Sequence, residues 1–303
     1  MNIIIIGSQG FIGTHLCNYF IAKGDNVYGA DIVETPVNIN YNYTKLSRLS
    51  TEWETLLADN KIDVCINSAG SGNVAYSVAH PLIDFEANTL DVIKILDAIR
   101  KHQPSCKYLH ISSAAIYGNP TSLPIKETDL LSPISPYGYH KMMSEIICKE
   151  YHHLFGLNIS IVRPFSVFGN GLRKQLLWDI CTKLTKEDSI TLFGTGNETR
   201  DFIHISDLVL LIDIIIKKSN FKIDIFNAAS GSETTIKKIA VFFENNFANK
   251  KHIDFNGVVK KGDPLNWDAD ISAIKNIGFI PNLNIEQNIT AYIKWFNLIN
   301  EKQ

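Results

Sequence analysis

Short apolar runs alternate with longer amphipathic stretches along the first half of the chain. The apolar runs have the length of strands and end in small or polar residues, which is typical of strands buried in a parallel sheet. They cover residues 3–6, 26–30, 62–67, 107–111 and 158–163. The amphipathic stretches between them predict helices over residues 11–20, 51–60, 81–102 and 137–155. This alternation predicts an α/β fold built on a doubly wound parallel sheet with helices on both faces.

The second half of the chain has a mixed pattern. Its periodicity predicts helices over residues 172–186, 207–218 and 234–247, and strands over 190–193 and 223–227. We expect the strand at 223–227 to return to the main sheet, and the polar stretch 34–50 to be irregular. The predicted organisation is a sheet-centred domain over residues 1–165, to which 205–230 return, and a smaller interleaved C-terminal lobe over 166–303.

Composition and charge exclude several classes of protein. The chain has 303 residues, of which 45% are hydrophobic and 20% charged, as in an ordinary globular protein. Its net charge of −2 gives no electrostatic reason to expect a nucleic acid or an anionic membrane as a partner. No basic segment precedes the first apolar run, and the longest later run, 208–216, is too short to span a bilayer. We therefore expect a cytoplasmic protein that binds neither nucleic acid nor membrane.

The cysteines and histidines indicate neither a disulfide framework nor a metal site. The cysteines are odd in number and far apart in the sequence: Cys17, Cys65, Cys106, Cys148 and Cys181. The nine histidines form no spaced cluster, and the adjacent His152 and His153 would point in different directions on a helix. We expect reduced cysteines and no bound metal.

Three glycines connect the first predicted strand to the first predicted helix. Gly7, Gly10 and Gly13 recur at every third residue between the isoleucine run 3–6 and the helical pattern. Glycines at such a turn let the backbone approach a pyrophosphate, and the helix N-terminus adds unpaired N–H groups with a partial positive charge. A glycine triplet alone is a weak signal, but the strand before it and the helix after it predict a Rossmann dinucleotide-binding site.

An acidic residue follows at the distance that this motif requires. Asp31 ends the second apolar run, close to the spacing of about 20 residues at which a carboxylate binds the adenosine ribose hydroxyls. A carboxylate there repels a 2′-phosphate, and residues 32–34 offer no Arg or Lys to bind one. The sequence therefore favours NAD over NADP as the cofactor.

The catalytic signal is a tyrosine and a lysine at the start of a predicted helix. Tyr137 and Lys141 are four residues apart, so they project from the same helix face. An ammonium group close to a phenol stabilises the phenolate, so we expect the Tyr137 pKa to be lowered toward the working pH. Such a tyrosine can take a proton from an alcohol as hydride leaves carbon, or return one to a ketone as hydride arrives. A lone Tyr-x-x-x-Lys often arises by chance, but this one follows both a dinucleotide motif and a strand that ends in Ser112 and Ser113.

Together these motifs resemble those of the extended short-chain dehydrogenase/reductases, and within them the NAD-dependent nucleotide-sugar epimerase/dehydratase branch, to which UDP-glucose 4-epimerases belong. The resemblance rests on the glycine spacing, on Tyr137 and Lys141, and on further runs at 113–118, 135–138, 163–165, 194–204, 262–264 and 269–271. It extends over essentially the whole chain. It implies that the first domain binds the dinucleotide and that the C-terminal lobe binds the substrate.

The resemblance also implies a role for each matching residue. Tyr137 would be the acid/base, Lys141 its electrostatic partner and a ligand of the nicotinamide ribose, and Ser113 the partner of the reacting sugar oxygen, with Ser112 as the alternative. Arg200 would bind the substrate diphosphate rather than form a surface ion pair with Asp201. The implied cofactor-binding set is Gly7, Gly10, Phe11, Ile12, Gly13, Asp31, Ala69, Gly70, Asn88, Tyr137 and Lys141.

Several positions depart from the family pattern. Ala114 and Ala115 stand where the dehydratases of the family carry acidic residues, which argues against elimination of water from the sugar. Ser166 and Lys260 replace residues, commonly Asn and Arg, at positions expected to contact the nucleotide diphosphate. We hypothesise that Arg173, within the run 172–175, supplies positive charge to the same group.

The implied substrate is a nucleotide-diphospho-sugar, and two enzymatic functions share the same catalytic residues. In a hexose 4-epimerase, Tyr137 deprotonates the C4 hydroxyl while hydride passes to bound NAD, and the 4-keto sugar turns over before hydride returns. In a 4-keto-6-deoxyhexose reductase, Tyr137 protonates the ketone while an external NAD(P)H delivers hydride. The sequence favours the epimerase over the reductase, and both over a non-catalytic NAD-binding regulator. The resemblance also suggests a homodimer that packs through the helices at 88–99 and 137–155.

Overall fold

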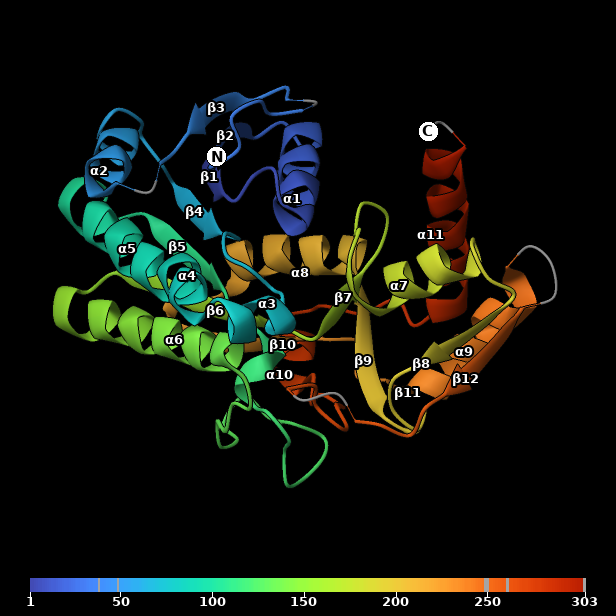
Figure 1. Cartoon of the computed structure of the whole chain (residues 1–303). Helices are drawn as coiled ribbons and strands as arrows, with labels where there is room; N and C mark the ends of the chain where they lie inside the picture. Colours follow the sequence, from blue (N-terminus) through green and yellow to red (C-terminus); the bar gives the residue numbers. More distant parts are fainter. Residues whose placement is uncertain (38, 48, 248–250, 260–261, 302–303) are drawn as a thin grey trace.

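A seven-stranded parallel sheet forms the centre of the computed structural model, which describes residues 1–37, 39–47, 49–247, 251–259 and 262–301 (Figure 1). The strand order is β10-β6-β5-β4-β1-β2-β3, and every neighbouring pair is parallel. The strands are β1 (Asn2–Ile6), β2 (Asn26–Asp31), β3 (Asn42–Lys45), β4 (Val64–Asn67), β5 (Lys107–Ile111), β6 (Asn158–Pro164) and β10 (Lys222–Ala228). This arrangement confirms the predicted doubly wound α/β fold.

Helices cover both faces of this sheet, as the four consecutive isoleucines of β1 require. Successive side chains on a strand point to opposite faces. Ile3 and Ile5 pack in one core with α1 (Phe11–Ala22) and α8 (Ile205–Lys218). Ile4 and Ile6 pack in a second core on the other face. The helices of that second core are α2 (Ser50–Ala58), α5 (Asp91–His102) and α6 (Pro136–Phe155).

The helix expected from residue 81 onward is present, but it is not a uniform α-helix. It begins as α4 (Pro81–Phe85), passes through a π-helical turn, η1 (Glu86–Leu90), and continues as α5. The short α3 (Val74–Ala79) precedes it, and the 3-10 turn η2 (Ala114–Ile116) follows β5. The π-turn contains Asn88. Such turns widen an α-helix and are frequent at functional sites.

The C-terminal part of the chain has its own core beside the main sheet. A three-stranded sheet, in the order β11-β9-β7, and a two-stranded sheet, β12-β8, pack with three helices (Figure 1). The elements are β7 (Ser166–Phe168), α7 (Gln175–Leu184), β8 (Ser189–Leu192), β9 (Thr199–His204), β11 (Glu233–Thr235), α9 (Ile236–Asn246), β12 (His252–Phe255) and α11 (Ile285–Asn300). The short α10 (Ser272–Asn276) packs instead in the core of the main sheet, through Ile274. Strand β10 returns to the main sheet, as expected, whereas the exact division into two domains stays a prediction.

The structure corrects one element of the sequence analysis outright. The stretch 34–50 was expected to be irregular, but it contains β3, the outermost strand of the sheet. Its sequence, Asn-Tyr-Thr-Lys, lacks an apolar run because an edge strand has only one neighbour and its side chains are largely in contact with solvent. Strands β7, β9, β11 and β12 and helices α10 and α11 were also not predicted.

Across the described ranges, no helix has the length and apolar character that crossing a membrane would require. All five cysteines are buried and free.

Candidate active site

The glycine turn joins β1 to α1 through contacts that leave no room for side chains. Gly7 has a left-handed φ of +81°, and a Cβ on it would lie 2.7 Å from the backbone nitrogen of Ala69. A Cβ on Gly13 would lie 2.0 Å from the carbonyl oxygen of Gly7. The N–H of Gly7 donates to the carbonyl of Ala30 at 2.8 Å, which fixes the turn to β2. Phe11 and Ile12 are the first two residues of α1 and are half-buried.

Asp31, at the end of β2, lies over this turn. Its carboxylate accepts the N–H of Gln9 at 2.9 Å and the N–H of Ile32 at 2.7 Å. The side chain nevertheless stays partly exposed, with lone pairs left for ribose hydroxyls. Lys45, the register partner of Asp31 on β3, is ion-paired with Glu34 instead. The fold therefore brings the carboxylate to the glycine turn, as the spacing predicts.

The loop after β4 packs against Asn88, whose side chain has a buried hydrogen-bond acceptor without a partner among the described residues. Gly70 has a φ of +120°, and a Cβ there would lie 2.3 Å from Oδ1 of Asn88. The Asn88 amide nitrogen donates to the carbonyl of Ser71 at 3.2 Å, whereas its Oδ1 is buried and accepts no hydrogen bond from the described residues. An unmet buried acceptor is expensive unless a ligand supplies the donor. Together with the glycine turn and Asp31, it fits a bound dinucleotide.

The start of α6 carries the predicted catalytic pair. Tyr137 and Lys141 are both buried on one face of the helix. The Lys141 ammonium donates to the carbonyl of Ile111 at 2.9 Å, at the end of β5. The Ser113 hydroxyl accepts the N–H of Ala115 at 3.1 Å and lies near enough to Tyr137 to favour its phenolate form. The alternative, Ser112, is buried and its hydroxyl donates to Glu145 at 2.6 Å, so it is already used within the protein.

Burial shifts the pKa values of both residues, and the shift of Tyr137 is opposite to the one expected from the sequence. Burial raises the pKa of Tyr137 to about 12, the nearby Ser113 hydroxyl opposes the rise, and the charge of Asp84 adds to it. Burial lowers the pKa of Lys141 to about 8, and the same Asp84 charge opposes that fall. The expectation that the Tyr137 pKa is lowered is therefore wrong for the protein alone, because desolvation of the phenolate is the largest influence on it.

Asp84 itself was not anticipated by the sequence analysis. It lies on α4, is fully buried, and contacts Nδ1 of His140 at 2.6 Å, while its other oxygen has no partner among the described residues. Because a carboxylate favours protonated neighbours, Asp84 acts on both Tyr137 and Lys141 from one side. Only tertiary packing brings it there, so no local motif could have indicated it.

A buried ionic network holds α6 against the sheet. Arg163 on β6 donates to both oxygens of Glu145, at 3.0 and 2.7 Å, and to the hydroxyl of Tyr117 at 2.7 Å. Tyr117 donates in turn to the Asn227 side chain on β10 at 2.7 Å. Glu145 is the third residue, after Tyr137 and Lys141, on the same four-residue spacing of α6. The network therefore fixes the helix that carries the catalytic pair.

Arg200, on β9, lies apart from the acidic residue that follows it. Its guanidinium donates to the carbonyls of Thr199 at 2.7 Å and Leu265 at 3.2 Å and lies over the Trp267 ring. The Asp201 carboxylate instead accepts the N–H and hydroxyl of Ser230 at 2.7 and 2.8 Å. Arg200 therefore forms no surface ion pair with Asp201, and its remaining donors are left for another group.

The other predicted substrate residues have fewer contacts. Ser166 is partly exposed on β7, and Arg173 is exposed in the loop before α7. Lys260 lies outside the described residues. Lys174, the neighbour of Arg173, lies close to Gly72: its ammonium nitrogen and the Tyr137 hydroxyl are each 3.8 Å from the position of a Cβ on Gly72. The sequence run 172–175 contains both cations, and the role of Arg173 stays a prediction.

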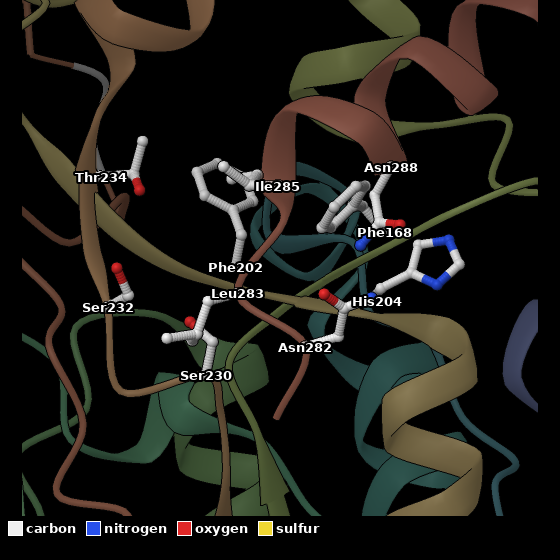
Figure 2. Close-up of a pocket in the computed structure, with 10 residues that line it drawn as sticks. All are labelled: Phe168, Phe202, His204, Ser230, Ser232, Thr234, Asn282, Leu283, Ile285 and Asn288. Carbon is white, nitrogen blue, oxygen red and sulfur yellow. The ribbon is translucent and has the colours of Figure 1, made fainter. Parts of the chain in front are cut away.

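Figure 2 shows a separate hollow between β9 and the start of α11. Aromatic and aliphatic side chains line it with serines, asparagines and the imidazole of His204. None of its lining residues belongs to the predicted site, so this hollow is not the catalytic cleft. In the part of the chain that the structure describes, no group of three or more His, Cys, Asp or Glu is arranged to hold a metal ion.

Comparisons with known proteins confirm the family resemblance. Residues 3–229 match the family described as NAD dependent epimerase/dehydratase. An uncharacterized protein of Methanocaldococcus jannaschii is 31% identical over 97% of this chain and 96% of its own length. A Bacillus subtilis protein named as an uncharacterized UDP-glucose epimerase is 27% identical over 98% of each chain. The solved UDP-glucuronic acid 4-epimerase from Bacillus cereus, in complex with UDP-glucuronic acid and NAD, is 26% identical, with a TM-score of 0.90 over 99% of this chain and 100% of that one.

Proposed function

This chain belongs to the NAD-dependent epimerase/dehydratase family, and we propose that it is an NAD-dependent 4-epimerase of nucleotide-diphospho-hexoses. One observation carries the proposal: residues 69–72 touch the glycine turn at one end and the catalytic tyrosine at the other. Ala69 packs against Gly7, and a Cβ on Gly72 would lie 3.8 Å from the Tyr137 hydroxyl. A dinucleotide that enters at the glycine turn and extends along this segment therefore reaches the acid/base.

The chain's own residues supply the proton chemistry. Bound NAD would accept a hydride from the sugar C4 and later return it. The Ser113 hydroxyl, which lies near Tyr137, would hold the C4 oxygen at the phenol. Tyr137 would take the hydroxyl proton as the C4 oxygen becomes a ketone and give it back when the alcohol re-forms. Lys141, buried below it, would stabilise the phenolate between the two transfers.

The structure supports retention of the sugar's oxygen atoms. Ala114 and Ala115 follow Ser113 directly in the turn η2, and neither can donate or accept a proton. Elimination of water needs a second acid/base pair at the sugar, which these positions do not provide. The site therefore favours reversible oxidation at C4 over dehydration.

A 4-keto-sugar reductase is the second candidate, and one observation favours it. Burial raises the Tyr137 pKa to about 12, so the phenol is protonated at neutral pH. A protonated phenol suits donation to a ketone, whereas an epimerase first needs the phenolate. A positively charged nicotinamide next to the phenol would reverse this preference, and for this reason we place the epimerase first.

A homodimer in the cytoplasm completes the proposal. Apolar side chains on α6 are exposed at helical spacing: Tyr139, Met143 and Ile146. Leu82 on α4 and Leu90 at the start of α5 are exposed as well. Such a face on two neighbouring helices would be covered if the helices of two copies packed together.

The decisive experiment begins with protein purified without added cofactor. The protein is denatured, the released nucleotide is identified and counted, and a second sample is incubated with UDP-hexoses while proton NMR follows the C4 epimers. We expect near-stoichiometric NAD(H) and epimerisation that requires no external cofactor. An empty protein that consumes NADH or NADPH with a 4-keto sugar would instead establish the reductase. Bound NAD without turnover of any nucleotide sugar would leave only the non-catalytic regulator.

A further inference from the structure

A lysine of the C-terminal lobe lies close to Gly72, as does the catalytic tyrosine of the predicted site. Lys174 precedes α7, at the end of the loop that leaves β7. Its ammonium nitrogen lies 3.8 Å from the position that a Cβ on Gly72 would take, and the Tyr137 hydroxyl lies 3.8 Å from the same position. Because Gly72 has no side chain, the space between the ammonium group and the phenol is left open. A cation and the acid/base thus face one small volume.

The charge of Lys174 has no partner in the described protein. Other lysines nearby do have partners: on α7 itself, Lys183 pairs with Asp179 at 2.8 Å. No described acidic side chain forms an ion pair with Lys174, although its side chain is open to solvent. The protein around it still desolvates the ammonium group and lowers its pKa. Such a position is unfavourable for an isolated cation and becomes favourable when an anion binds.

The chemistry of a nucleotide-diphospho-sugar limits what that anion can be. The diphosphate is attached to C1, across the ring from C4. When C4 lies at the Tyr137 hydroxyl, we place the diphosphate on the far side of the ring from the phenol. Arg200, which lies on β9 with free donors, is better placed for the diphosphate. The substituent next to C4 that can carry a negative charge is the C6 group on C5, as a carboxylate.

We propose that Lys174 binds the C6 carboxylate of a nucleotide-diphospho-hexuronate, and that this class of sugar is the substrate. The inference rests on the proposed 4-epimerase, because it assumes that C4 lies at Tyr137. An ammonium–carboxylate hydrogen bond beside C4 would hold the sugar in register with the phenol and Ser113. The flexible lysine stem can follow the carboxylate as the sugar turns, which a rigid guanidinium fork would do less well.

The test compares two sugars on the NAD-loaded protein. Wild type is expected to prefer UDP-glucuronate over UDP-glucose in kcat/KM, and Lys174→Met is expected to lower the ratio of the two values at least about tenfold, mainly through KM for the uronate. Lys174→Arg keeps the positive charge and should restore part of the ratio. Lys186→Met removes an exposed cation just beyond α7 and should leave the ratio unchanged. An unchanged ratio in Lys174→Met, or a wild type that prefers the neutral sugar, overturns the proposal.

A binding measurement separates this proposal from the proposed function. Titration calorimetry gives the affinities of both UDP-sugars for the NAD-loaded wild type and for Lys174→Met. A preference for the uronate that is lost in the variant supports the Lys174 site even if neither sugar is turned over, and in that case only the epimerase is rejected. Equal affinities in both proteins reject the Lys174 site, whatever the turnover.

Discussion

The two sides of the proposed cleft are built differently. On the side of the main sheet, Tyr137, Lys141 and Glu145 are buried along one face of α6 and tied to β5 and β6. On the side of the C-terminal lobe, Lys174 lies on a loop that is open to solvent, and Arg200 lies at the end of the lobe's small sheet. The first side is held by packing and hydrogen bonds within the protein, whereas the second presents donors that the protein does not saturate.

This difference separates what each side can do. Burial restricts the phenol, but it also raises the Tyr137 pKa and lowers the Lys141 pKa, so the protein alone disfavours the charged forms that catalysis uses. Lys174 and Arg200 form no ion pair within the described residues, and desolvation lowers the pKa of each, so an anionic substrate would relieve that cost. We therefore expect substitutions on α6 to change chemistry or stability, and substitutions in the C-terminal lobe to change substrate choice.

The largest effect is expected from Tyr137→Phe. The variant keeps the ring in its pocket but removes the hydroxyl that transfers the proton, so kcat should fall by roughly 10³-fold. NAD content and unfolding temperature should stay within error of wild type, as measured by nucleotide release and thermal melting. Tyr139→Phe is the matched control, because Tyr139 lies two residues away with its side chain exposed. Full turnover by Tyr137→Phe would show that Tyr137 is not the acid/base of the reaction.

The buried side is the one that the sequence predicts well. The isoleucines of β1, the glycine turn and the Tyr137–Lys141 spacing are local patterns, and their periodicity is set by strand and helix geometry. The seven-stranded sheet followed from such patterns except at β3, whose polar edge gives no apolar signal. The return of β10 to the sheet was also predictable, because an apolar run needs a buried neighbour.

What the sequence could not supply depends on contacts between distant segments. Asp84 reaches the catalytic pair from α4, and Arg163 reaches Glu145 from β6. Neither lies at a spacing that a single helix or strand would encode. The raised Tyr137 pKa has the same origin, since the degree of burial is decided by the whole fold. The choice between Arg173 and Lys174 likewise depends on how one loop folds back over Gly72.

Arg163→Met tests whether the buried network holds α6. The substitution leaves the Glu145 carboxylate, 1% exposed, without its bidentate partner, and breaking a buried ion pair in this way costs about 3–5 kcal/mol. Urea unfolding of wild type and variant measures the change. Lys101→Met, which breaks exposed pairs with Glu54 and Asp97, should change stability little. If both variants lose the same free energy of unfolding, the buried network stabilises the protein no more than a surface ion pair does.

Lys141→Met is expected to stabilise the protein while it abolishes activity. Burial lowers the Lys141 pKa from 10.5 to about 8. At pH 7 the ammonium group is therefore charged in both states, but it is buried in the folded state and fully hydrated in the unfolded state. Removing that charge should raise the free energy of unfolding by about 3 kcal/mol, less about 1 kcal/mol for the lost hydrogen bond to Ile111. The measurement is urea unfolding of NAD-free protein, since bound cofactor would add its own stabilisation.

The pH dependence of this gain tests its cause. Below about pH 8 the lysine is charged in both the folded and the unfolded state, so the full penalty is present. Between pH 8 and 10.5 the folded state has released the proton while the unfolded state still binds it, so wild type gains stability as the pH rises. The difference between Lys141→Met and wild type should therefore be constant near pH 7 and shrink toward pH 10. Lys149→Met, on the same helix but partly exposed, should show no such trend. A gain that does not depend on pH would mean that packing of the methionine, rather than removal of a buried charge, stabilises the variant.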